Sequence, residues 1–153
     1  MNAEKNIIVS LKKINSKIKL LTLINKAKIE FDKNNYAGAA SICEDILSDN
    51  PHNALALRCL GCVMQNIGNK EDAINYYKKA LKYSDNKEIE YTLLGTIHYL
   101  DNELDDAIRY YNLAIDTNDD YDTAYEGRNQ AILERHIEIV ELQDLLSKQF
   151  FKN

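Results

Sequence analysis

Two stretches of equal length decide the fold: residues 57–81 (LRCLGCVMQNIGNKEDAINYYKKAL) and residues 91–115 (YTLLGTIHYLDNELDDAIRYYNLAI). Each has a Leu-Gly pair near its start, at 60–61 and at 94–95, and each continues with the pattern Ala-x-x-x-Tyr-x-x-Ala. All of these positions are offset by the same 34 residues. Agreement at so many positions in one register predicts a repeated supersecondary unit.

The spacing of apolar residues inside each stretch is that of α-helices. Leu57, Leu60 and Met64 follow one another at i, i+3 and i+7, which places them on one helix face. Short polar segments at 68–70 and 101–103 separate two such helices in each unit, and short connections favour antiparallel neighbours. Each unit is therefore predicted to be a helix hairpin, which buries its apolar face only by stacking on the next hairpin.

Small residues mark the expected helix crossings. Gly61 and Gly95 stand at equivalent positions of the first helices, and Ala73 and Ala107 at equivalent positions of the second. Only a short or missing side chain allows two helix backbones to approach closely. We therefore expect the two helices of each hairpin to cross at these residues.

The pattern resembles that of the tetratricopeptide repeat family. The residues that carry the resemblance are Leu57, Leu60, Gly61, Ala73, Tyr77 and Ala80 in one repeat, and Tyr91, Leu94, Gly95, Ala107, Tyr111 and Ala114 in the next. An earlier repeat matches less well, because Lys26 and Glu30 replace apolar residues, and Asp85 and Asp119 replace the closing Pro of the later repeats. The resemblance implies an all-α fold, a right-handed α-solenoid of antiparallel helix hairpins. The expected segments are an N-terminal amphipathic helix or cap (1–19), three repeats (20–53, 54–87 and 88–121) and a long C-terminal capping helix (122–153).

The segments outside the repeats are amphipathic. Five apolar residues near the N-terminus follow a 4-3-4-3 spacing, which is the seam of a packing helix: Ile7, Leu11, Ile14, Ile18 and Leu21. This helix either caps the first repeat or pairs with a partner or a second copy. The C-terminal segment is richer in apolar residues than a solvent-exposed cap requires, which is typical of an interface. We expect it to support a homodimer or to fold back, through Ile139, Leu142, Leu146 and Phe150.

Composition limits the function classes. The chain has 153 residues and a net charge of −5, distributed as +4 in residues 1–19 and −9 in the remainder. An acidic body argues against a nucleic-acid binder, because neutralising phosphates requires a basic face. No apolar run is long enough to span a membrane. The N-terminus lacks the core of a signal peptide, so we expect a cytoplasmic protein whose three cysteines are reduced.

The motifs that could carry chemistry are incomplete. Cys59 and Cys62 form a C-x-x-C pair, but no second pair completes a zinc site and no preceding strand indicates a redox fold. Residues 116–122 alternate oxygen-bearing side chains but lack the Gly and Glu of a calcium loop. His98 occupies a core-facing aromatic position. We therefore expect no metal, no cofactor and no enzyme activity.

The resemblance implies a concave groove lined by the first helices of the hairpins. The residues expected there are Leu21, Asn25, Lys28, Leu55, Arg58, Cys59, Cys62, Gln65, Ile89, Thr92, Leu93, Thr96, Tyr99, Glu126 and Gln130. Family members that bind the C-terminal carboxylates of chaperones carry a fixed set of Lys, Asn and Arg on this surface. Here only Lys28 is cationic among the corresponding residues, so an acidic C-terminal tail would lack partners.

Two functions remain from this reasoning. The first is a non-catalytic scaffold, adaptor or chaperone-like module that binds a peptide segment of a partner protein in the groove. The second is a self-associating assembly module that uses the N-terminal and C-terminal helices. A thiol redox or metal-binding role for Cys59 and Cys62 is the least favoured.

Overall fold

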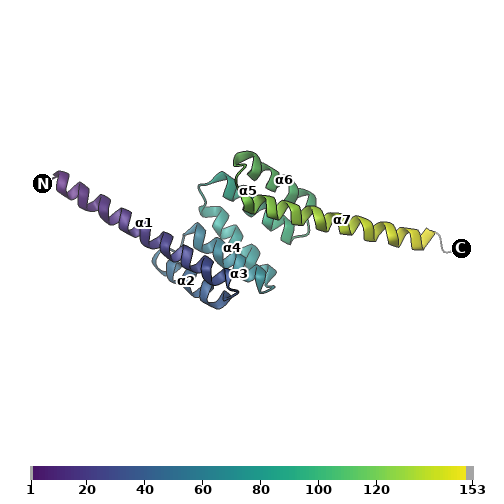
Figure 1. Ribbon diagram of the computed structural model, residues 1–153, viewed down its shortest axis with the longest axis horizontal. Helices are drawn as coiled ribbons and strands as arrows, with labels where there is room; N and C mark the ends of the chain where they lie inside the picture. Colours follow the sequence, from purple (N-terminus) through teal and green to yellow (C-terminus); the bar gives the residue numbers. More distant parts are fainter. Residues whose placement is uncertain (1, 151–153) are drawn as a thin grey trace. The chain divides into compact units, whose positions relative to one another are not determined.

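The computed structural model describes residues 2–150, and the described part of the chain consists of helices joined by short turns, without strands. The helices are α1 (Asn2–Asp32), α2 (Tyr36–Asp49), α3 (Ala54–Asn66), α4 (Lys70–Tyr83), α5 (Lys87–Leu100), α6 (Leu104–Thr117) and α7 (Asp122–Phe150). Figure 1 shows them as a series of antiparallel hairpins, α1/α2, α3/α4 and α5/α6, followed by α7. The predicted all-α architecture of helix hairpins is confirmed.

The three hairpin turns are built alike. Each has one residue in the left-handed region, Asn34 (φ 60°), Gly68 (φ 82°) or Asn102 (φ 63°), and these residues are 34 positions apart. In each turn the next N–H donates back to a carbonyl five residues earlier, as from Asn35 to Glu30 at 2.9 Å. This Schellman arrangement satisfies carbonyls left unpaired at a helix end. The period is therefore present in the backbone as well as in the side chains.

Asparagine side chains begin four of the helices. The Oδ1 atom of Asn53 accepts from Ala56 N at 3.0 Å, and Asn86 accepts from Ile89 N at the same distance. Asn35 and Asn69 cap α2 and α4 in the same way. A capping side chain satisfies one of the free N–H groups of the first helical turn. Asn is abundant in this chain partly because the turns use it.

The chain divides into two compact units, Met1–Tyr83 and Ser84–Asn153. The core of the first unit contains the buried residues Ala27, Cys43, Ile46, Ala56 and Leu60. The core of the second contains the buried residues Leu104, Ala107, Tyr111, Ala114, Ala124 and Ala131. Each unit therefore has its own apolar core, built around small residues at helix crossings.

The glycines of the Leu-Gly pairs lie where two helices cross. A Cβ atom on Gly61 would lie 2.5 Å from Cδ1 and Cε1 of Tyr77, and one on Gly95 would lie 2.8 Å from the same atoms of Tyr111. A Cβ on Gly127 of α7 would lie 2.5 Å from Cζ and 2.6 Å from Cε1 of the same Tyr111 ring. The predicted close crossings at Gly61 and Gly95 are confirmed.

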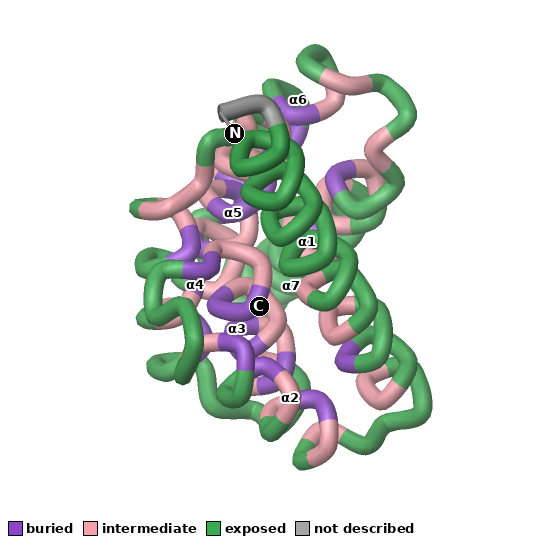
Figure 2. Tube along the Cα trace, turned by 90° about the vertical axis from the view of Figure 1, so that its left-hand side faces the viewer, coloured by how far each residue is buried: buried purple, intermediate pink, exposed green. Residues whose placement is uncertain are grey.

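Helix α1 differs from the segmentation expected from sequence. Residues 2–32 form one continuous helix, so no boundary separates an N-terminal cap from the first repeat. No Gly or Pro precedes Gly38, so nothing in the sequence stops the helix near residue 19. Residues 4–19 are exposed, and the N-terminal part of α1 extends beyond α2 (Figures 1 and 2). The segment expected as an N-terminal amphipathic helix or cap is therefore the N-terminal part of α1, and its role as a cap stays a prediction.

None of the helices within the described residues combines the length and the apolar character that crossing a membrane requires.

Candidate functional site

The first unit presents one part of the expected groove on α1 and α3, which contact each other. Asn25 and Lys28 on α1 are exposed, as is Leu21, whose side chain is 48% accessible. The residues from α3 are all partly exposed: Leu55, Arg58, Cys59, Cys62 and Gln65. This surface is mixed in character, with apolar, thiol, amide and cationic groups.

A hydrogen bond ties this surface to the second helix of the hairpin. The buried Tyr77 hydroxyl donates to Gln65 Oε1 at 2.7 Å and lies 3.4 Å from Cys62 Sγ. The ring of Tyr77 packs against Gly61, so the same residue sets the helix crossing and fixes Gln65. The polar end of α3 is therefore held in place by the core beneath it.

The cysteines are arranged differently from the expected C-x-x-C pair. All three are free thiols, and Cys59 is hydrogen-bonded to the buried Cys43 of α2. That bond lowers the pKa of Cys59 and raises the pKa of Cys43, whose burial raises it further. Burial also raises the pKa of Cys62. Cys59 is therefore the thiol whose reactive thiolate forms most readily.

The second unit presents the other part of the expected groove on α5 and α7, which also contact each other. Ile89, Thr96 and Tyr99 on α5 are partly exposed, and Glu126 and Gln130 on α7 are exposed. The Tyr99 hydroxyl donates to Glu134 of α7, which also accepts from Gln130 Nε2 at 2.9 Å. Desolvation and the Glu134 carboxylate raise the pKa of Tyr99 to about 12. Tyr99 is thus a neutral donor that joins α5 to α7.

Two residues expected to line the groove lie in the interior. Leu93 is 2% exposed and Thr92 is 6% exposed. The Thr92 hydroxyl donates to the Glu88 carbonyl at 2.8 Å, so its polar atom is satisfied within α5. The 34-residue register identifies equivalent positions on the repeats, but it does not tell which of two adjacent helix faces is covered. We therefore assign Thr92 and Leu93 to packing.

His98 has partners that the sequence analysis missed. Its ring stacks on Tyr110 with centroids 5.0 Å apart, and its Nδ1 lies 2.5 Å from Glu103 Oε2. Asp106 completes a group whose ligand atoms lie within 4.8 Å of one another. Asp106 is also held by Arg109, whose Nη2 donates at 2.8 Å. These bonds join the ends of α5 and α6, so His98 and its neighbours already satisfy one another.

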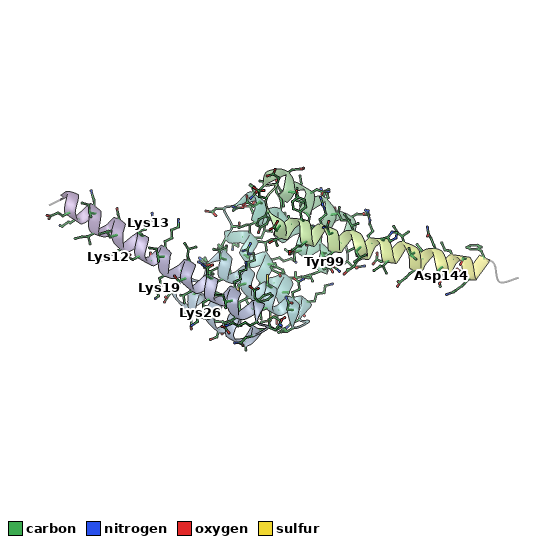
Figure 3. All side chains as sticks on the ribbon, viewed as in Figure 1. Lys12, Lys13, Lys19, Lys26, Tyr99 and Asp144 are labelled. Carbon is green, nitrogen blue, oxygen red and sulfur yellow. The ribbon has the colours of Figure 1, made fainter. Side chains whose placement is uncertain are left out.

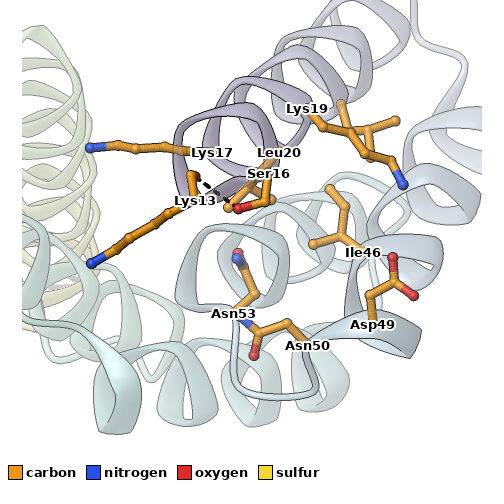
Figure 4. A pocket seen from close by; sticks show the side chains of 10 residues that line it. Lys13, Ser16, Lys17, Lys19, Leu20, Ile46, Asp49, Asn50 and Asn53 are labelled. Carbon is orange, nitrogen blue, oxygen red and sulfur yellow. Dashed lines mark hydrogen bonds between the residues drawn. The ribbon is translucent and has the colours of Figure 1, made fainter. Parts of the chain in front are cut away.

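A pocket of about 450 Å³ lies within the first unit, where α1 extends past the end of α2. Its floor is apolar and comes from Leu20, Leu23 and Ile46. Figure 4 shows Lys13 and Lys17 extending to one side of it and Lys19 to the other. No motif signalled this pocket, because it depends on the unequal lengths of α1 and α2. The residues from α2 and the following turn that complete it are Asp49, Asn50 and Asn53.

The residues expected to support oligomerisation are exposed on the distal half of α7. Ile139, Leu142 and Leu146 have exposed fractions of 47%, 56% and 42%, and Phe150 has 74%. Every described residue from 136 to 150 is exposed. Residues 139–150 therefore carry large apolar side chains that nothing in the described structure covers.

These observations define a class: a helix-hairpin repeat protein with surfaces on the first helices of its hairpins. Residues 54–87 match the tetratricopeptide repeat family model, over the same range as the second expected repeat. A search of curated proteins found no match.

Solved structures with this fold are similar over most of the chain. The crystal structure of MamA matches with 25% identity and a TM-score of 0.52, covering 72% of this chain and 64% of that one. The Sgt2 tetratricopeptide domain from Aspergillus fumigatus matches with 18% identity and a TM-score of 0.60, covering 78% and 80%. The first such domain of Spaghetti (RPAP3), bound to an HSP90 peptide, matches with 14% identity and a TM-score of 0.58, covering 76% and 92%.

The chain spans somewhat less than two thirds of MamA, and the Sgt2 and RPAP3 matches show the fold alone. Together they show that the chain has the fold of tetratricopeptide-repeat solenoids and that residues 54–87 match one such repeat.

Proposed function

We propose that this protein is a non-catalytic interaction module that binds a peptide segment of a partner protein on the first helices of its hairpins and on the start of α7. The observation that carries the proposal is the partly exposed polar and apolar surface of α3, which lies over a core that keeps it in place. Arg58, Cys62 and Gln65 lie there at the i, i+4, i+7 spacing of one helix face. Such a surface offers both apolar anchors and hydrogen-bonding groups to a peptide.

Two further points support it. The RPAP3 domain, which has the same fold, is bound to the peptide SRMEEVD in its solved structure. The clusters that could carry chemistry in the described residues, around Cys59 and around His98, have hydrogen-bonding partners within the protein.

The charges on the proposed surface differ between the two units. The cationic residues Lys28 and Arg58 lie in the first unit, whereas Glu126 and Glu134 lie in the second. We expect the peptide to have two or three apolar anchors, and a micromolar Kd.

The test is selection of binding peptides from a random display library on the wild-type protein, followed by calorimetric titration of a selected peptide. Each unit supplies a charge reversal on the proposed surface and a matched reversal on a second helix. Lys28→Glu is matched by Lys78→Glu of α4, and Glu126→Lys is matched by Asp116→Lys of α6.

We expect at least one surface variant to weaken binding fivefold or more, and both matched controls to stay within about twofold of wild type. A charge that the bound peptide covers contributes more to the affinity than a charge on a distant helix. Failure to select any peptide, or equal loss in surface and control variants, would contradict the proposal.

A second candidate function is self-association as an assembly module. It is favoured by the exposed apolar residues on α7 and on the N-terminal half of α1.

A further inference from the structure

Two helix segments extend beyond the cores of their units, and each carries an uncovered apolar face. On α1, Ile7, Leu11, Ile14 and Ile18 are each more than half exposed. On α7, Ile139, Leu142, Leu146 and Phe150 are exposed and lie on one face of the helix. We define the first set, with Leu21, as the α1 seam and the second as the α7 face. Several large apolar side chains exposed together on one helix face normally mark an interface.

The α1 seam lies on the side of the helix away from its own core. Leu23 and Ala27 pack against the α2 residues of the first unit. At about 100° per residue, the seam lies roughly half a turn around the helix from these two residues. The 4-3-4-3 spacing of the seam is that of a helix that packs along another helix. The seam therefore requires a helical partner that this unit does not supply.

The two segments are opposite in charge. Residues 4–19 of α1 hold five Lys and one Glu, a net charge of +4. Residues 137–150 of α7 hold Glu138, Glu141, Asp144 and Lys148, a net charge of −2. Figure 3 shows Lys12, Lys13 and Lys19 along the first segment and Asp144 on the second. Two α1 segments or two α7 segments would bring like charges together, whereas an α1 segment and an α7 segment attract each other.

The segments also match in length. The exposed part of α1, residues 4–19, is about 24 Å long, and residues 137–150 of α7 are about 21 Å long, at about 1.5 Å per residue. A helix pair of this length accommodates the whole α1 seam against the whole α7 face.

We propose that the α1 seam of one molecule packs against the α7 face of a second copy of this chain. The partner is a second copy because the chain itself carries both halves of a complementary pair. Apart from Leu21, which belongs to both surfaces, this contact uses residues other than those expected to bind peptide, so either proposal can fail without the other. Pairing in both directions gives a closed dimer, and pairing in one direction gives a chain of molecules.

The test is a complementation experiment followed by sedimentation. One variant, Leu11→Asp with Ile18→Asp, disrupts the α1 seam, and a second, Leu142→Asp with Leu146→Asp, disrupts the α7 face. All four residues are exposed, so helicity by circular dichroism should remain that of wild type. We expect each variant alone to associate at least tenfold more weakly than wild type. An equimolar mixture should form a 1:1 complex, because each variant retains the half that the other has lost.

Matched controls replace exposed apolar residues on the opposite side of the same helices. Val9 is 65% exposed and Ile137 is 46% exposed, and both lie roughly half a turn from the proposed contacts. Val9→Asp and Ile137→Asp should associate with a Kd within about threefold of wild type, because rim charges contribute little. Arg58→Glu, which alters only the peptide surface, should also associate as wild type does.

Salt gives an independent test. Raising NaCl from about 50 to 500 mM shortens the Debye length from roughly 14 to 4 Å and should weaken a contact between opposite charges. Four results would overturn the proposal: a wild-type protein that stays monomeric at about 200 µM, where even weak interfaces associate; a double variant that self-associates less than about tenfold more weakly than wild type; a mixture that fails to associate; or association that strengthens with salt. A monomeric wild-type protein is also the result expected if α1 pairs with α7 of the same molecule, so that pairing would overturn the proposal too.

Discussion

Replacing Gly61 by Ala should destabilise the first unit, although Ala is the better helix former. In a helix interior this replacement gains about 1 kcal/mol from propensity. The added Cβ would lie 2.5 Å from two ring carbons of Tyr77, whereas carbon atoms in good contact are about 3.5–4.0 Å apart. The helices must therefore separate by about 1 Å, and overpacking of this kind costs about 1–3 kcal/mol or more. We expect a net loss of up to about 2 kcal/mol in the free energy of unfolding.

The assay is urea unfolding followed by circular dichroism at the helix band, with a double-mutant cycle. Tyr77→Val removes the ring atoms that the new methyl group would meet, so in that background Gly61→Ala should become neutral or stabilising by up to about 1 kcal/mol. The change of sign is the diagnostic result. If Gly61→Ala stabilises the wild-type protein, or if its effect is the same in both backgrounds, the close crossing is not what constrains Gly61.

Three further predictions concern single groups. Cys59 should react with a thiol reagent well before Cys43, since their hydrogen bond lowers the pKa of Cys59 and raises that of Cys43; equal labelling rates at the two positions of the wild-type protein, followed by peptide mass mapping, would contradict this order. Burial raises the pKa of Tyr111 to about 12 and that of Tyr99 to about 12, so both should ionise well above the ordinary tyrosine value of 10 in an ultraviolet titration. Because the folded pKa is raised, the stability that the neutral phenols contribute is complete below pH 10 and is lost as pH rises through 12. Asn53→Ala removes the cap on Ala56 N and should cost about 1 kcal/mol in urea unfolding, an effect that Asn53→Asp should largely avoid.

The repeat architecture could be predicted from sequence because its determinants are local and recur. The glycines at helix crossings and the turn asparagines are specified by short patterns at a fixed spacing. Gly68 and Asn102 are different residues at equivalent turn positions, and both take the left-handed conformation that Gly and Asn tolerate best. The 34-residue period therefore predicts the hairpin turn even where Gly in one repeat is replaced by Asn in the next.

The details of the surface depend on packing that the period does not encode. Leu93 is buried although the register placed it among groove residues, because a rotation of one residue around a helix decides which face is covered. Cys59 is hydrogen-bonded to Cys43 of α2, a contact that the C-x-x-C spacing of Cys59 and Cys62 does not predict. The pocket over Ile46 exists because α1 runs past the end of α2. Predicting any of these features requires the distances between helices, which the 34-residue period does not contain.

The central claim is that the first helices of the hairpins carry the peptide-binding surface. Hydrogen–deuterium exchange of the wild-type protein, with and without a selected peptide at saturation, tests it most directly. We predict slower exchange in α3, α5 or both when the peptide is bound, and unchanged exchange on the exposed faces of α4 and α6. Protection confined to α4 and α6, or to residues 137–150 of α7, would contradict it.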